Sequence, residues 1–114
     1  MPQAPCASRP AAPLYHYVVV RDDLPRGIAS AQIVHAADES VEERVPKNTH
    51  AVVLTVPDEP ALWRLRTRLE TTSARFVCVV EDDAPYTGQF MAIGFAPVRK
   101  EVIGRHLSRL PLLR

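Results

Sequence analysis

The sequence predicts an α/β protein in which a four-stranded mixed sheet carries helices on both faces, a three-layer sandwich. Two observations predict it. Four runs rich in β-branched and aromatic residues have the composition of strands. Of the stretches between them, one is rich in alanine, which favours helix, and another repeats leucine at helical spacing. Along the chain the order is strand, helix, strand, helix, strand, strand, helix. Helices that connect strands of one sheet lie against its faces, so this order predicts layers.

The first strand and the first helix open the predicted domain. Residues 14–21, Leu-Tyr-His-Tyr-Val-Val-Val-Arg, are almost uniformly apolar and predict a buried strand near the centre of the sheet. Residues 22–27 contain the loop formers Asp, Pro and Gly. The alanines that follow favour a helix from Ile28 to about Arg44, which Pro46 closes.

The second strand and helix follow the same logic. Residues 50–56 are a β-branched run and predict a strand. Asp58 is placed to cap a helix whose first turn contains Pro60. In that helix Leu62, Leu65 and Leu69 recur at helical spacing while arginines occupy the other faces, the pattern of an amphipathic helix on a sheet.

Two strands and a helix complete the predicted domain. Residues 74–81 and 89–95 predict strands joined by an acidic loop that contains proline, and the last helix runs from about residue 97 towards residue 106. Open sheets of this kind usually bind ligands beyond the carboxyl ends of their strands. The loops after Arg21 and Glu81 are therefore the expected site.

Length and composition limit the classes of function. The 114 residues suffice for one domain, and 46% hydrophobic with 24% charged residues is typical of a globular protein and excludes collagen, coiled-coil and low-complexity arrays. The formal net charge is +1, so the protein has no overall field that would hold nucleic acid or an anionic membrane. A nucleic-acid partner would have to meet a local basic patch.

The first residues of the chain and the two cysteines provide expectations about domain bounds and the cellular compartment. Four of the 11 prolines fall within residues 2–13, which predicts a flexible arm over residues 1–13 before a domain over residues 14–114. The start lacks the apolar segment of a secretion signal, and no window has the roughly 18 apolar residues of a membrane span, so we expect no membrane association. Cys6 and Cys78 are too few for a disulfide framework or a metal set, which favours a reducing cytoplasm.

Spacing alone identifies candidate polar residues but no familiar catalytic set. The three acids from Glu81 to Asp83 follow a strand, where one carboxylate can act as a general base or all can form a solvated turn. His35 is a candidate base or RNA ligand, with a histidine bonded at the helix–sheet interface as the alternative. Ser30 lacks the second glycine of a nucleophile elbow and is not expected to be a nucleophile. The arginines of the C-terminal segment could contact phosphates or form a solvated face.

The motifs resemble those of a known family. Residues 18–24, Gly27 and residues 31–37 (Ala-Gln-Ile-Val-His-Ala-Ala) look like the opening of the type II peptidyl-tRNA hydrolases, and residues 81–85, 92–97 and 105–113 follow the family's later segments in order. The resemblance covers nearly everything after residue 14. It implies a cytosolic esterase that needs no metal or cofactor, cleaves the bond between a peptide and its tRNA, and is usually a homodimer. The alanine-rich first helix is a candidate dimer interface.

Two departures place the chain closer to a divergent, short-loop branch of that family. Where the family has a glycine-lysine-glycine-lysine stretch this chain is shorter, so Ile28 stands at the position of the functional lysine and Arg26 is the nearby cation. After the retained Asp82 a family segment is missing, and Gln89 stands where threonine is usual. Arg26 can bind an anion but cannot exchange a proton near neutral pH.

The resemblance therefore implies a specific set of site residues and leaves two functions open. In the first, Asp82 is the general base of ester hydrolysis or orients the attacking water, and backbone amides near Gly27, helped by Arg26, stabilise the oxyanion. In the second, the chain is an inactive relative that binds tRNA or a partner. The expected catalytic residues are Asp82 and His35; the expected substrate-binding residues are Arg26, Gly27, Gln32 and Gln89.

Overall fold

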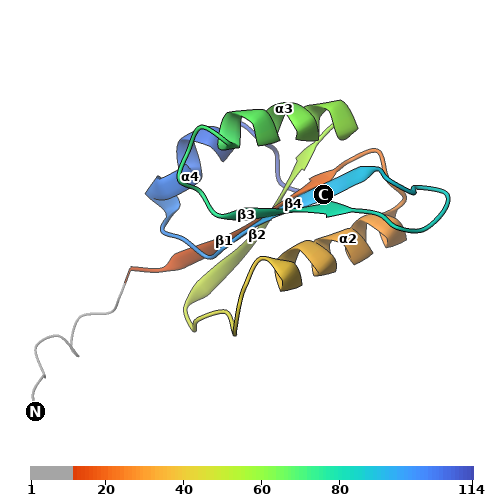
Figure 1. The fold of residues 1–114 in the computed structure, drawn as a ribbon. Helices are drawn as coiled ribbons and strands as arrows, with labels where there is room; N and C mark the ends of the chain where they lie inside the picture. The colour runs from red at the N-terminus through yellow and green to blue at the C-terminus, as the bar shows by residue number, and fades with distance from the viewer. Residues whose placement is uncertain (1–11) are drawn as a thin grey trace, which may run out of the picture.

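A computed structural model describes residues 12–114 and confirms the predicted α/β class (Figure 1). Residues 1–11, which include Cys6 and most of the predicted arm, lie outside the described part. The elements are β1 (Leu14–Arg21), α2 (Arg26–Glu39), β2 (Thr49–Val56), α3 (Glu59–Leu69), β3 (Phe76–Val80), β4 (Phe90–Phe95) and α4 (Lys100–Leu107).

The four strands form a mixed sheet in the order β2-β1-β4-β3. β1 pairs with β2 in parallel, and β4 is antiparallel to both β1 and β3, so β1, β2 and β3 run in the same direction. Figure 1 shows α2 on one face of the sheet and α3 and α4 on the other. The prediction that residues 14–21 form a central strand is confirmed, because β1 lies inside the sheet and is buried from His16 onward.

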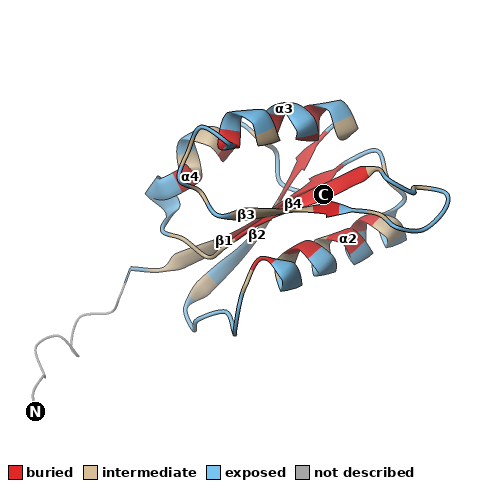
Figure 2. Ribbon diagram, viewed as in Figure 1, coloured by how far each residue is buried: buried red, intermediate tan, exposed pale blue. Residues whose placement is uncertain are grey.

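The sheet separates two hydrophobic cores of different character (Figure 2). On the α3 side the predicted Leu62, Leu65 and Leu69 are fully buried against large residues such as Phe95. On the α2 side the core consists of smaller residues: Val18, Val20, Ala29, Ala36, Val79 and Ala92. Small side chains let the axis of α2 lie close to the strands.

Three helix boundaries differ from the prediction. α2 begins at Arg26, two residues before Ile28, and tertiary contacts explain the two larger differences. α2 ends at Glu39 rather than near Arg44, because the Ser40 hydroxyl donates to the Ala37 carbonyl (3.1 Å), and the acidic pair that follows would be unfavourable at a helix C-terminus. α4 begins at Lys100 rather than near residue 97, because Val98 exchanges two backbone hydrogen bonds with Tyr15 (2.6 and 3.0 Å) and stays extended. The predicted cap of α3 is confirmed, since Asp58 Oδ1 accepts from the Ala61 amide at 3.0 Å.

A buried histidine ties β1 to the end of α2. His16 is 7% exposed, and its Nε2 is 2.8 Å from Ser40 Oγ. Burial lowers the pKa of His16 below its ordinary value of 6.5. The folded protein therefore binds fewer protons there than the unfolded chain, so this contribution to stability is fully present above pH 6.5 and is lost as pH falls through the lowered pKa.

We therefore expect the free energy of unfolding to decrease as the pH is lowered from 8 to 5. The measurement is urea denaturation across that range, with His16→Gln as the comparison, because glutamine keeps a polar partner for Ser40 but does not titrate. The decrease should be smaller in His16→Gln. Identical pH profiles would show that His16 does not carry the effect.

Candidate functional site

The loops expected to form the site meet at one end of the sheet. Because β1, β2 and β3 are parallel, their carboxyl ends lie at the same end, joined by the start of the antiparallel β4. The loop between β3 and β4 projects beyond that end (Figure 1). The backbone closes this loop at its base, where the Glu81 amide donates to the Gln89 carbonyl (3.0 Å) and the Gly88 amide donates to Glu81 (2.7 Å).

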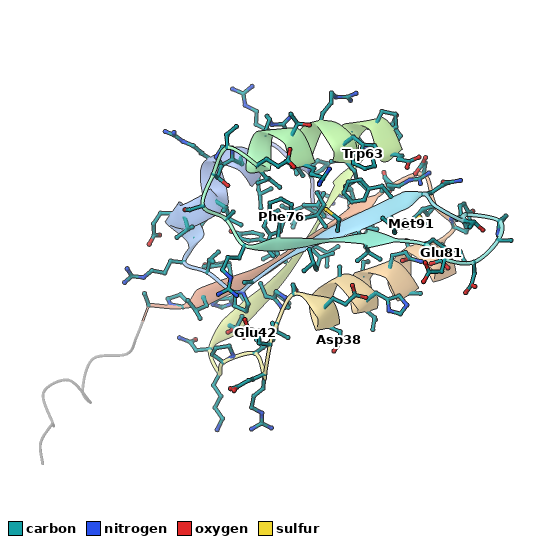
Figure 3. All side chains as sticks on the ribbon, viewed as in Figure 1. Asp38, Glu42, Trp63, Phe76, Glu81 and Met91 are labelled. Carbon is teal, nitrogen blue, oxygen red and sulfur yellow. The ribbon has the colours of Figure 1, made fainter. Side chains whose placement is uncertain are left out.

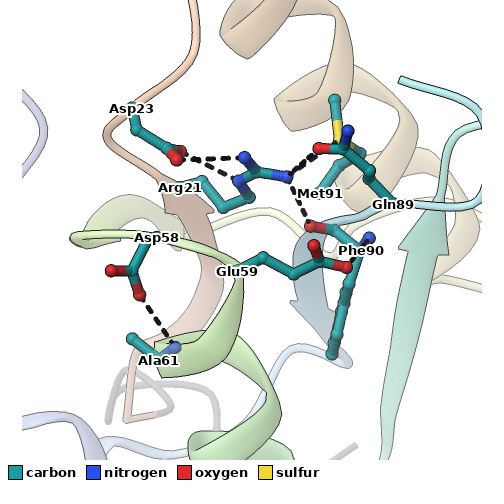
Figure 4. Close-up of polar contacts among 8 residues, drawn as sticks. All are labelled: Arg21, Asp23, Asp58, Glu59, Ala61, Gln89, Phe90 and Met91. Carbon is teal, nitrogen blue, oxygen red and sulfur yellow. Dashed lines mark hydrogen bonds and ion pairs between the residues drawn. The ribbon is translucent and has the colours of Figure 1, made fainter. Parts of the chain in front are cut away.

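A buried arginine joins the loops around it. Arg21 is 7% exposed. Its Nε and Nη2 donate to the two carboxylate oxygens of Asp23 (2.9 and 3.0 Å), and its Nη1 donates to Gln89 Oε1 (2.8 Å) and the Phe90 carbonyl (3.3 Å) (Figure 4). From α3, Glu59 Oε2 accepts from the Phe90 amide at 2.9 Å. This arrangement, which we call the Arg21 cluster, holds the ends of β1 and β4 and the start of α3 together.

Charge pairing keeps the Arg21 cluster ionised. The hydrogen bond to Asp23 raises the pKa of Arg21, and the same bond lowers the pKa of Asp23 below its ordinary value of 3.8. All three guanidinium nitrogens of Arg21 thus donate to protein acceptors, and Arg21 acts as a structural residue. Arg21 holds the side-chain oxygen of Gln89, an expected substrate-binding residue. The side-chain amide nitrogen of Gln89 is therefore the group that remains to bind a ligand.

A polar hollow of about 270 Å³ lies between α2 and the end of β3. It brings together the two expected catalytic residues, Asp82 from the β3–β4 loop and His35 from α2. We call it the acidic hollow; its lining residues are His35, Glu39, Val79, Val80, Glu81, Asp82 and Asp83. His35 is exposed, so the alternative of a histidine bonded at the helix–sheet interface is wrong.

Gln32 fixes the carboxylate beside Asp82. It is 4% exposed, and its Nε2 donates to Glu81 Oε1 at 3.0 Å, a contact between α2 and the acidic loop (Figure 3 labels Glu81). Gln32 Oε1 is buried and has no hydrogen-bond partner among the described residues. An unpaired buried carbonyl is costly and is uncommon away from functional sites. The expected placement of Gln32 and His35 on one helix next to the acidic loop is therefore found, with Gln32 beneath the surface and His35 on it.

A second hollow, of about 540 Å³, lies at the beginning of α2. Arg26 and Arg114 provide positive charge and Asp22 provides one carboxylate, whereas Leu24, Ala29 and Leu113 provide apolar surface. The helix contributes backbone donors as well. Its first intrahelical bond is from the Ala29 amide to the Pro25 carbonyl (2.9 Å), and no side chain caps the preceding amides, Gly27 among them. We call this the arginine hollow.

The structure thus distributes the expected site residues over two hollows. Asp82 and His35 line the acidic hollow, with Gln32 bonded to its wall, whereas Arg26 lines the arginine hollow; the two hollows have no lining residue in common. The Ser30 hydroxyl donates to the Arg26 carbonyl of its own helix (2.9 Å), an arrangement that does not activate a nucleophile.

Sequence reasoning did not find the Arg21 cluster or the contribution of the C-terminus to the arginine hollow. One signal for the cluster was available, because Arg21 ends an otherwise apolar strand and an acid follows two residues later. The C-terminal segment reaches the hollow because the Thr55 amide donates to Pro111 (2.9 Å) and the Leu113 amide donates to Val53 (3.0 Å), which extends β2 at its edge. No local sequence pattern predicts that the C-terminal segment pairs with β2.

Residues 12–114 contain no group of three or more His, Cys, Asp or Glu side chains that could hold a metal ion. The longest helix of that part, α2 with 14 residues, is too short to cross a membrane, and none of the others is long and apolar enough.

Comparisons with known proteins identify a shared fold. No family model matches the sequence, and no curated protein matches it. Among solved structures, a protein of unknown function from Agrobacterium tumefaciens strain C58 superposes with a TM-score of 0.56 at 17% sequence identity, covering 91% of this chain and 100% of that one. The chain is therefore similar in fold to a bacterial α/β protein over nearly its whole length.

Proposed function

We propose that this protein is a peptidyl-tRNA hydrolase-like esterase that releases a peptide or an N-blocked amino acid from tRNA. The observation that carries the proposal is the acidic hollow, where Asp82 and His35 come together from a loop and a helix. Both residues belong to the segments that resemble the type II peptidyl-tRNA hydrolases. The proposed reaction uses water and needs no metal or cofactor, and the proposed compartment is the cytoplasm.

In this mechanism the Asp82 carboxylate accepts a proton from a water molecule, which attacks the carbonyl carbon of the ester. The bond between that carbon and the ribose oxygen then breaks, and the protonated imidazole of His35 donates a proton to the leaving oxygen. The proton held by Asp82 passes to His35 through water, which restores both groups. Glu81, held by Gln32 Nε2, stays out of the proton transfer.

The arginine hollow supplies the anion site that tRNA requires. Arg26 and Arg114 lie at the beginning of α2, where unpaired amides and the helix dipole also favour negative charge. A phosphate near the acceptor end of tRNA would bind there while the ester lies in the acidic hollow. The net charge of +1 makes such a local patch necessary for binding.

One observation favours the alternative, an inactive relative that binds tRNA or a protein partner. The acidic hollow is lined by several carboxylates and by no lysine or arginine, and Ile28 occupies the place of the family's functional lysine. Without a cation the oxyanion of the transition state would depend on hydrogen bonds alone.

The experiment that tests the proposal is incubation of the purified full chain with an N-acetylated aminoacyl-tRNA. Catalytic release of the N-acetyl amino acid, many molecules per protein, supports the esterase. Binding of the tRNA without release supports the alternative in its tRNA-binding form. Neither binding nor release would contradict the esterase and the tRNA-binding relative, and would leave only a relative that binds a protein partner.

We expect Arg26→Ala to weaken tRNA binding and to reduce the slope of log affinity against log salt by about one, because one phosphate contact is lost. Turnover at saturating substrate should change little. The matched control is Arg64→Ala, since Arg64 is exposed on α3 across the sheet. Filter binding at several salt concentrations measures both variants, and equal weakening by the two would contradict a specific role for Arg26.

A further inference from the structure

Within residues 12–114, one edge of the sheet carries backbone groups that have no partner. β3 is the last strand in the order β2-β1-β4-β3, so β4 pairs with only one of its sides. The Arg75 carbonyl accepts from Ala96, and the Glu81 amide donates to Gln89 (both 3.0 Å), which directs the odd-numbered residues of this segment towards β4. The N–H and C=O groups that point to the open edge are those of Phe76, Cys78 and Val80.

The side chains at this edge favour association. β3 is the apolar sequence Phe-Val-Cys-Val-Val, with no charge, proline or glycine to discourage pairing. Val80 is 47% exposed, and Trp63 on the adjoining α3 is 46% exposed (Figure 3). Both are large apolar residues that remain in contact with solvent in the isolated chain.

We propose that β3 pairs antiparallel with β3 of a second copy of this chain, around a two-fold axis at Cys78, so that two four-stranded sheets become one. In this register Cys78 faces Cys78, and Phe76 faces Val80. These are the residues whose backbone groups point outward, so each outward N–H meets a C=O of the other copy. The pairing does not rest on the proposed esterase function. It places the interface between copies at β3 and not at α2, the alanine-rich helix that the sequence offered as a candidate interface.

Charge complementarity selects this register. It sets Arg75 of one copy opposite Glu81 of the other, and the two-fold axis makes the pair occur twice. The two side chains lie on the same face of the sheet, because Arg75 contacts Glu42 just beyond the end of α2 (2.8 Å) and Glu81 contacts Gln32 of α2 (3.0 Å). An in-register parallel pairing would instead bring Arg75 near Arg75 and Glu81 near Glu81, which is repulsive.

The pairing has a consequence for the acidic hollow. Glu81 lies in its wall, and the hollow has no lysine or arginine among its lining residues. In the dimer, Arg75 of the second copy comes to the rim of that hollow. The guanidinium of that Arg75 would give the acidic hollow a cation that its own chain does not place among the lining residues.

The test uses the full chain and charge reversal at the two facing positions. Light scattering should give about twice the monomer mass of 12.7 kDa at tens of micromolar. Arg75→Glu and Glu81→Arg should each weaken dimerisation by about tenfold or more, because each sets like charges opposite each other twice. Arg68→Glu, at an exposed position on α3, is the control and should leave the mass unchanged.

The deciding sample is an equimolar mixture of the two single variants. Each glutamate of one variant then faces an arginine of the other, so the mixture should dimerise although neither variant does so alone; the double variant Arg75→Glu/Glu81→Arg should also dimerise. A monomeric wild-type chain at tens of micromolar would overturn the proposal. So would a dimer that is indifferent to both reversals, or a mixture that stays monomeric.

Discussion

Gly94→Ala is expected to destabilise the protein by about 3 kcal/mol, at the upper end of what overpacking costs. Gly94 lies in β4 against α2, and a Cβ added there would come within 2.2 Å of the Ala36 carbonyl oxygen and 2.8 Å of its carbon. Those atoms belong to the helix backbone, so no side-chain rotation relieves the clash. Alanine at position 94 would push α2 away from the sheet.

The matched control for this prediction is Gly104→Ala. A Cβ at Gly104 meets no atom within 4 Å, and the residue lies inside α4. Alanine should therefore stabilise α4 by up to about 1 kcal/mol through its higher helix propensity. Thermal unfolding measures both, and for a domain of this size Gly94→Ala should lower Tm by roughly 10 °C or more. An unchanged Tm would show that α2 does not approach β4 as closely as described.

The close contact at Gly94 also links the fold to the site. α2 carries Gln32 and His35, and the small residues of the core beneath it set the distance of the helix from the strands. A displacement of α2 would move His35 relative to Asp82 and break the 3.0 Å bond between Gln32 and Glu81. Gly94→Ala should consequently impair any activity of the acidic hollow along with stability.

The elements were predictable from the sequence because each carries its own local pattern. The apolar run of residues 14–21 and the spacing of Leu62, Leu65 and Leu69 depend on burial alone, and both predictions are confirmed. The ends of the helices depend on distant partners. Val98 stays extended because it pairs with Tyr15, which is far away in the sequence. No sequence pattern near residue 98 predicts that pairing.

The candidate site likewise has features that follow from local sequence patterns and features that depend on distant partners. Strand order places the loops after Arg21 and Glu81 at one end of the sheet, and that much follows from the pattern of strands and helices. The contacts of Arg21 with Gln89 and of Gln32 with Glu81 join residues 68 and 49 positions apart. Such pairs depend on side-chain geometry across three elements, which one sequence does not encode in any local spacing. The roles of the site residues stay predictions.

Asp82→Asn is expected to lower turnover by about 10² to 10⁴, the usual cost of losing a general base, while tRNA binding stays nearly unchanged. Asparagine keeps the size of the side chain but cannot accept the proton from water. Asp82 is exposed and forms no part of either hydrophobic core, so the substitution should leave the fold intact. The matched control is Asp83→Asn, which removes the neighbouring carboxylate of the same hollow.

The most direct measurement of the central claim is multiple-turnover release of N-acetyl amino acid from N-acetylated aminoacyl-tRNA, with the wild type, Asp82→Asn and Asp83→Asn assayed side by side. We expect repeated turnover by the wild type, loss of about two orders of magnitude or more in Asp82→Asn, and a change of less than about tenfold in Asp83→Asn. Equal rates for the wild type and Asp82→Asn, or a wild type that binds the tRNA and releases nothing, would contradict ester hydrolysis at the acidic hollow.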